Sequence, residues 1–314
     1  MKRFITMIVA VCTFFAVSAQ NPMVTLSHNG ELSFFTNIGA FKTAYDAAEN
    51  GDILYLSVGD FILDGGKIAI EKRLSIVGSG YDTHILGDIS FKLDTPYEMN
   101  APLFDGVRLD DIEFNVLNSY YKNIGQSEIL RSWIRTVEYA DYAGTDVLYD
   151  KCYLEKIICY NSRGGNVILR NSKIGYLEGG YNVTVENCNI NDADYYPRSM
   201  TSSIFNKNSK CATSGKHSIF NSLLNLNHDD TQVTKYDCYI NSDASLLNDK
   251  LESTIDLTAN SYFGKDGTTE VGIHGGESPF SENPSVPTVD SSKSSVEYDA
   301  ASNKLKVSIT VKAD

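Results

Sequence analysis

One eight-residue phrase recurs along the chain and limits what the chain can fold into. It has two apolar residues at alternate positions, a polar turn residue, a small residue, a spacer and a final apolar residue. It is clearest in VILRNSKI from Val167 and VTVENCNI from Val183. Further copies, VRLDDIEF, SEILRSWI, VLYDKCYL, HSIFNSLL and VTKYDCYI, begin at residues 107, 127, 147, 217 and 233, and a degraded copy ends at Phe263. Most steps are sixteen or twenty residues, with a poorly matched copy near Ile204, and such a repeat predicts a solenoid.

The alternation within the phrase predicts the type of solenoid. Val183 and Val185 alternate as in a half-buried strand, but Cys188 and Ile190 alternate on the opposite parity, so the chain must bend between them. The bend residue is asparagine or aspartate, types that accept left-handed backbone angles: Asp111, Asn171, Asn187, Asn221 and Asp237. The sequence therefore predicts an all-β fold, a single-stranded parallel β-helix of about ten coils, with strands stacked along its axis.

A column of small residues follows the bends, and the alternation places it inside the coil. Its members are Ile112, Ser132, Cys152, Ser172, Cys188, Ser222, Cys238 and Ser261. Cysteine in this column is expected to act as a small buried side chain. Cys159 and Cys211 lie outside the column, and a disulfide between them stays open as an alternative.

The two ends of the chain predict export and capping. Residues 1–19 have a basic start and an apolar stretch, as a secretory signal peptide does, and the mature protein is expected to be extracytoplasmic without a transmembrane segment. Residues 20–37 form an N-terminal segment, and residues 38–274 form the β-helix domain, beginning with a capping helix that ends near Asn50-Gly51. Residues 275–295 read as a Gly/Pro/Ser linker, and residues 296–314 as a β-hairpin tail. The tail either covers the last coil, the favoured interpretation, or attaches the protein to a surface.

Charge narrows the possible partners. Removing residues 1–19 takes Lys2 and Arg3 from 27 basic side chains and none from 40 acidic ones, which leaves a formal charge of −15. Nucleic acid is an unsuitable partner, because phosphate neutralisation requires a basic face. A strongly acidic polysaccharide is disfavoured unless calcium or a local basic patch intervenes.

Residues 38 to 265 resemble a right-handed parallel β-helix protein of the pectin-lyase-like type. The resemblance rests on AFKTAYDAAENGDILYLSVGDF as an amino-terminal cap and first coil, and on VTVENCNI as a repeated coil. With the signal peptide and tail, the chain is similar to exported β-helix proteins of Bacteroidetes. The resemblance implies the fold and the handedness, but the fold hosts lyases, hydrolases, epimerases and adhesins, so it does not imply one activity.

The catalytic patterns of that family are incomplete here. Asp229-Asp230 resembles the paired aspartates of the hydrolases and His274-Gly275 their His-Gly, but the sequence has no Asn-Thr-Asp and no Arg-x-Lys. The catalytic candidates are Asp229, Asp230 and Asp194. Asp229 and Asp230 could bind calcium or share a proton, although a solvated turn is the simpler interpretation. No other metal or cofactor is expected.

Two groups of residues are candidates for ligand binding. The first is the loop residues Asp192, Tyr195, Tyr196 and Arg198, which could contact sugar rings or form only a polar bulge. The second is a column of Tyr120, Tyr139, Tyr160 and Tyr181, spaced by about one coil. On an outer face these tyrosines would form a strip for a linear glycan; otherwise they stabilise the coil corners.

The leading functional hypothesis is a secreted or envelope β-helix protein that binds a polysaccharide or cell-surface glycan without catalysis. The alternative is a polysaccharide-active enzyme, either a calcium-assisted lyase or a glycoside hydrolase. A third hypothesis is a purely structural surface protein. An enzyme should bring carboxylates together in a lateral groove, whereas a binding protein should show an aromatic strip there.

Overall fold

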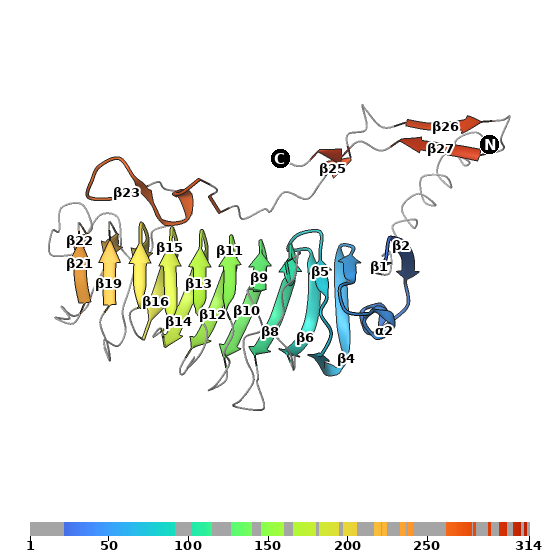
Figure 1. Cartoon of the computed structure of the whole chain (residues 1–314), viewed down its shortest axis with the longest axis horizontal. Helices are drawn as coiled ribbons and strands as arrows, with labels where there is room; N and C mark the ends of the chain where they lie inside the picture. The colour runs from blue at the N-terminus through green and yellow to red at the C-terminus, as the bar shows by residue number, and fades with distance from the viewer. Residues whose placement is uncertain are drawn as a thin grey trace, which may run out of the picture.

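The structure, a computed structural model of the chain, is an elongated solenoid of β-strands with one short helix near its N-terminal end (Figure 1). It describes residues 22–91, 102–114, 127–139, 146–159, 166–179, 182–194, 197–205, 217–220, 222–224, 233–236, 238–240, 262–277, 279–280, 288–289, 295–299, 304–308 and 311–312.

Two long sheets form the body. In spatial order the first sheet contains β2 (Glu31–Phe35), β1 (Val24–His28), β3 (Ile53–Leu56), β5 (Ser75–Val77), β7 (Phe104–Asp105), β9 (Ser127–Leu130), β11 (Val147–Asp150), β13 (Val167–Arg170), β15 (Val183–Glu186), β17 (Ser199–Thr201), β19 (His217–Phe220) and β21 (Val233–Tyr236). The pairs β2–β1 and β1–β3 are antiparallel, and every later pair in this sheet is parallel.

The second sheet is parallel throughout. It contains β4 (Gly59–Ile70), β6 (Thr83–Phe91), β8 (Arg108–Phe114), β10 (Trp133–Tyr139), β12 (Tyr153–Cys159), β14 (Lys173–Gly179), β16 (Asn189–Ala193), β18 (Ile204–Phe205), β20 (Leu223–Leu224) and β22 (Tyr239–Ile240). The chain alternates between the two sheets, so each turn adds one strand to each. This confirms the predicted all-β solenoid of parallel strands.

The inward residues of both sheets form one continuous core. In the first sheet Val167 and Leu169 are fully buried, while Ile168 between them faces out. In the second-sheet strands the alternation of inward and outward side chains is broken once. In β14, for example, the inward residues Ile174 and Leu177 are separated by two residues instead of one. The described part of each turn therefore shows two corners, one between the sheets and one within the second sheet.

The corner between the sheets is the bend that the sequence predicts. Asn171 and Asn187 have positive φ angles of 45° and 50°, as expected for these types, and Arg131, Lys151 and Ser202 take the equivalent position with φ of 46°, 57° and 45°. The backbone N–H groups of four of these bends donate to a carbonyl of the next turn, as from Asn171 to Glu186 at 3.0 Å; the four are Arg131, Lys151, Asn171 and Asn187. The predicted bends at Asn221 and Asp237 lie outside the described residues.

For the copy that begins at Val107, the sequence predicts the bend at the wrong residue. Asp111 is not a bend but lies within β8 opposite Thr136, and Leu109, not Phe114, is opposite Ile134. The bend of this turn is Gly106, with φ of 62°. The regular alternation of inward and outward residues in VRLDDIEF is broken at the corner within the second sheet. This corner gives the same pattern of apolar residues as the corner between the sheets.

The small-residue column lies inside the solenoid, as predicted, and links successive turns. The amide of Cys152 donates to Ser172 Oγ at 3.0 Å, that of Ser172 to Cys188 Sγ at 3.4 Å, and that of Cys188 to Ser203 Oγ at 3.1 Å. Ser203 thus joins the column at the poorly matched copy, while Ile112 does not belong to it, because Val107 is the residue that donates to Ser132 Oγ. Ser261 lies outside the described residues.

The cysteines of the described residues are free buried thiols: Cys152, Cys159, Cys188 and Cys238. Burial raises the pKa of Cys188 to about 12 and also raises the pKa values of Cys152 and Cys159. Cys159 is therefore not bridged to Cys211, which itself lies outside the described residues.

The predicted number of about ten full coils is too high. About five turns have strands of four or more residues in both sheets among the described residues: β3/β4, β9/β10, β11/β12, β13/β14 and β15/β16. The other described turns have a strand of only two or three residues on at least one side. In β17, for example, only Met200 points inward, because its neighbours are polar and face out.

The predicted short helix forms near the N-terminal end, with two additional strands. The helix α2 (Ala40–Ala47) buries Phe41 and Ala44, and Lys72 Nζ donates to the carbonyls of Tyr45, Asp46 and Ala48 at its C-terminal end at 2.7–2.9 Å. β1 and β2 come from the segment 20–37, for which the sequence predicted no strands.

A segment that we call the strap, residues 262–277, crosses the corner between the sheets. It contains β23 (Tyr262–Phe263), β24 (Glu270–Val271) and the 3-10 turn η2 (Gly272–His274). Gly272 N–H donates to Ser202 O at 2.8 Å and Ile273 N–H to Asn189 Oδ1 at 3.2 Å. Residues 275–277, predicted as the start of a linker, are thus the end of this strap.

The C-terminal strands are β25 (Thr288–Val289), β26 (Ser295–Asp299), β27 (Lys304–Ser308) and β28 (Val311–Lys312), with β26 and β27 paired antiparallel. Figure 1 shows this pair far from β21 and β22 along the long axis. The residues that connect these strands to the strap lie largely outside the described part, so the interpretation that the tail covers the last coil stays a prediction.

Candidate functional site

The outer side of the corner between the sheets carries the most distinctive surface of the described residues. In the turns from β8 to β14, the second-sheet strand begins just after the bend, and its first residue points outward because the buried residue before it points inward. In four successive turns this first residue is Arg108, Trp133, Tyr153 and Lys173, which the strand register places side by side. Neighbouring strands lie about 4.8 Å apart, so the column is about 14 Å long.

The four side chains stack on one another. The Arg108 guanidinium carbon lies 3.4 Å from the centre of the Trp133 ring, and the Lys173 Nζ lies 5.1 Å from the centre of the Tyr153 ring. The two rings are stacked with centres 6.0 Å apart and an interplanar angle of 27°. Each cation over a ring contributes about 0.5–1 kcal/mol at a surface site, so the column is held in place before any ligand arrives.

The charge of this surface differs from that of the chain as a whole. The ring faces are occupied by neighbours in the column, so solvent meets the ring edges, which carry the positive part of the aromatic quadrupole. The adjacent bends add Arg131 and Lys151. We call these six residues the corner strip: Arg108, Arg131, Trp133, Lys151, Tyr153 and Lys173. It is a local basic surface on a chain of formal charge −13.

Acidic side chains beside the strip are paired with arginine. Arg131 binds Asp105 with its Nε 2.9 Å from Oδ1, and Arg170 binds Asp150 with its Nη2 3.1 Å from Oδ2. These hydrogen bonds raise the pKa values of both arginines, which remain charged. Arg108 and Lys173 form the cationic ends of the aromatic column.

A second column, three residues further along each second-sheet strand, contains Lys156 and Tyr176, and Tyr176 contacts the predicted acid Asp194. The Tyr176 hydroxyl donates to Asp194 Oδ1 at 2.5 Å, and this hydrogen bond is the main cause that raises the pKa of Tyr176 to about 12. Asp194 is only 5% exposed. Lys156 Nζ, 5.7 Å from the centre of the Tyr176 ring, is 2.6 Å from Glu178 Oε2.

The other predicted ligand-binding residues are dispersed. Asp192 lies opposite Tyr176 in the sheet register, and Arg198 is exposed just before β17. Tyr139 is 3% exposed and stacks inside the solenoid on Phe114, so its predicted place on an outer strip is wrong. Asp229, Asp230, Tyr195, Tyr196, Tyr120, Tyr160 and Tyr181 lie outside the described residues.

The regular spacing of two aromatic residues in the sequence indicates the corner strip, although neither residue is among the predicted site residues. Trp133 and Tyr153 occupy the spacer position after the small residue in two consecutive copies of the phrase, twenty residues apart. The alternation makes this position outward. Trp133 is also the single tryptophan of the chain.

Neither metal binding nor membrane spanning has support in the described part of the chain. It contains no group of three or more His, Cys, Asp or Glu side chains that could hold a metal ion. Its helices are too short or too polar to span a membrane. The calcium prediction at Asp229 and Asp230 stays a prediction, because both residues lie outside the described part.

Comparison with known proteins gives no relative. No family model matches the chain, and neither curated proteins nor solved structures give a match.

Proposed function

We propose that this protein is an extracytoplasmic β-helix that binds a linear polysaccharide along the corner strip without cleaving it. The observation that carries the proposal is the stacked column of Arg108, Trp133, Tyr153 and Lys173 across four turns. The column repeats its contacts at the spacing of the strands, about 4.8 Å, and therefore suits a ligand that also repeats along its length.

The preferred ligand is a glycan that carries carboxylate or sulfate groups. Guanidinium and ammonium groups donate charge-assisted hydrogen bonds to such anions. The acidic chain as a whole repels polyanions, so binding has to be local to the strip and sensitive to salt. The hydroxyl edge of Tyr153 adds contacts with sugar hydroxyls.

The only tryptophan provides a direct assay. A polysaccharide that binds the corner strip should change the fluorescence of Trp133, and the change should weaken as salt is added. We expect Tyr153→Ala to lower the affinity by about 2- to 5-fold, because a cation over one ring contributes about 0.5–1 kcal/mol at a surface site. The matched control is Tyr236→Ala, an outward tyrosine of the first sheet that is 47% exposed.

Two outcomes would contradict binding at the strip. One is that no acidic or neutral polysaccharide changes the fluorescence of Trp133 at any salt concentration. The other is that Tyr236→Ala weakens retention as much as Tyr153→Ala does. A response only to neutral glycans would keep the strip but reject the anionic ligand.

One observation favours the alternative of a polysaccharide-active enzyme. The Tyr176 hydroxyl, with its pKa of about 12, lies against Asp194 beside the strip and could serve as a proton donor. Chain cleavage is followed by reducing ends and by unsaturated-uronate absorbance, with and without calcium. Cleavage that is lost in Tyr176→Phe would establish this alternative in place of simple binding.

The finer assignment of the fold and the place of action belong to the same proposal. The resemblance of residues 38 to 265 supports a right-handed, pectin-lyase-like β-helix, and residues 1–19 support export. Amino-terminal sequencing of the protein recovered outside the cytoplasm should begin at Gln20. A chain that retains Met1 and stays in the cytoplasm would reject this part of the proposal.

A further inference from the structure

Large exposed apolar side chains gather at the N-terminal end of the solenoid. The described residues contain ten large hydrophobic side chains that are exposed, and seven of them belong to residues 23–62: Met23, Leu32, Phe34, Ile38, Tyr55, Val58 and Ile62. Phe34 is 62% exposed and Ile38 is 95% exposed. Concentration of apolar surface at one end of a soluble protein indicates an interface.

The outermost strand of this end has a free edge. β2 is first in the order of its sheet and pairs only with β1 among the described strands. Natural edge strands are protected by proline, lysine, a bulge or a cover, but β2 reads ELSFF and pairs with β1 in unbroken register. Its unpaired backbone groups are therefore available to another strand.

The outer face of β2 is apolar and in line with its neighbours. Phe34 lies opposite Thr25, which lies opposite Tyr55 on β3, so these three side chains form one row across the sheet. Leu32 lies on the same face, two residues away. Phe35, on the other face, packs against the core.

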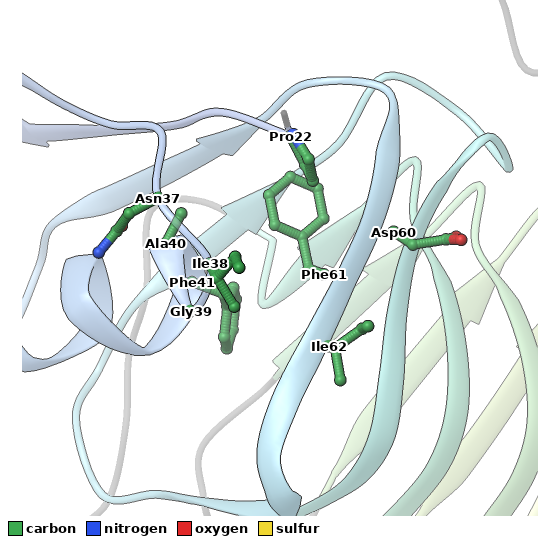
Figure 2. A pocket seen from close by; sticks show the side chains of 9 residues that line it. All are labelled: Pro22, Asn37, Ile38, Gly39, Ala40, Phe41, Asp60, Phe61 and Ile62. Atoms are coloured by element: carbon green, nitrogen blue, oxygen red, sulfur yellow. The ribbon is translucent and has the colours of Figure 1, made fainter. Parts of the chain in front are cut away.

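A hollow of about 190 Å³ lies between residues 37–41, which follow this strand in the chain, and residues 60–62 of β4 (Figure 2). Phe41 and Phe61, both buried, form its floor, and the exposed Ile38 and Ile62 stand at its rim. This volume is below the range of sites for drug-sized ligands, about 300–1,000 Å³, and is of the size that takes an apolar side chain. The end face thus combines a free strand edge with a place for a side chain.

We propose that a second copy of this chain covers the N-terminal end, with the two β2 strands paired antiparallel about Ser33. The strand is complementary to itself in this register, because Leu32 faces Phe34 of the partner subunit and Glu31 faces Phe35 of the partner subunit. Glu31 is the only charged residue of β2, so the pairing brings no like charges together. The contact is two-fold symmetric and closes after two copies, which is the commonest form of homo-oligomer.

The register makes a sharp test by disulfide crosslinking. Directly opposed residues of antiparallel strands have Cα atoms about 4.5–5.5 Å apart, within the range a disulfide spans. Ser33→Cys should therefore form a covalent dimer under mild oxidation. Glu31→Cys is the matched control on the same face of β2, because its two copies would be about 13 Å apart. The native thiols that the structure describes are buried and add little background.

Mass measurement gives the second test. The mature chain, residues 20–314, should be a dimer by light scattering at concentrations up to about 100 µM, where an interface of ordinary size is saturated. Phe34→Lys should give a monomer with an unchanged circular dichroism spectrum, since Phe34 is exposed. Ile168→Lys, at an exposed residue of β13, should leave the dimer intact.

Each other result overturns the proposal. A wild-type monomer throughout this concentration range would reject the second copy. Equal crosslinking of Ser33→Cys and Glu31→Cys would reject the register. If deletion of residues 296–314 abolished the dimer while Phe34→Lys did not, the C-terminal strands would be responsible for association instead of β2.

Discussion

Ser172 tests whether the small-residue column stabilises the stacking of turns. Its side chain is fully buried, its Oγ accepts the amide of Cys152 at 3.0 Å, and it donates to Arg170 O at 2.7 Å. Ser172→Ala leaves the buried Cys152 N–H without this acceptor. A buried donor left unpaired costs about 1–3 kcal/mol of the free energy of unfolding.

Ser127 provides the matched control. It is 3% exposed, but its Oγ has no hydrogen-bond partner in the described part of the chain. Ser127→Ala removes the same atom without orphaning a backbone group, so its effect should stay within about 0.5 kcal/mol or be stabilising. The two variants thus differ in hydrogen bonding and not in burial.

Hydrogen exchange at the amide of Cys152, together with urea unfolding, measures the effect. A loss of 1–3 kcal/mol accelerates exchange by between about 5-fold and 140-fold, because 1.4 kcal/mol corresponds to a factor of ten. Ser172→Cys should recover most of the protection, since Cys188 Sγ accepts the corresponding bond one turn later. Equal destabilisation by Ser172→Ala and Ser127→Ala would refute a role for the hydrogen bond.

Three further predictions concern pH, thiol reactivity and the strap. Burial raises the pKa values of Tyr139 and Tyr149, whose hydroxyls are 2.7 Å apart, well above the ordinary value of about 10. The native state keeps these protons when the unfolded chain loses them. The free energy of unfolding should therefore fall above about pH 10, by up to about 1.4 kcal/mol per pH unit for each tyrosine. If the free energy of unfolding of Tyr139→Phe fell equally steeply above pH 10, this explanation would be wrong. The Cys188 thiol, buried with a pKa of about 12, should react with a disulfide reagent only after unfolding, and fast modification of the native protein would count against its position. Gly276→Ala should accelerate proteolysis within the strap, because its Cβ would lie 2.6 Å from a side-chain nitrogen of the neighbouring bend; Gly267→Ala, also at positive φ but with nothing within 4 Å, should have a smaller effect.

The sequence predicted the regular part of the fold because each turn is a local pattern. Asn171 and Asn187 bend the chain through their own backbone preference, and Ser172 and Cys188 are small enough for the inner corner. The phase of the copy at Val107 was wrong, because two corners per turn produce the same parity switch and only hydrogen-bond register distinguishes them.

The site was less predictable, because it depends on which outward positions of different turns meet. The tyrosine column was inferred from spacing alone, yet Tyr139 takes an inward position opposite Phe114. Trp133 and Tyr153 have an equally regular spacing, and the bend that precedes them makes them outward. The cationic ends were not predicted, because Arg108 and Lys173 come to lie beside the rings only through the strand register.

The hydrogen bonds between turns have a mechanical consequence. They run along the long axis, since each strand pairs with the strand of the next turn in the same sheet. A pulling force applied along this axis loads all the strand pairs in series, so the first interface to yield is the weakest one and not the sum of all. Extra turns would therefore lengthen the protein's reach without raising the force that it withstands. The turns with two-residue second-sheet strands, β18, β20 and β22, should detach before those with seven-residue strands, β8, β10, β12 and β14.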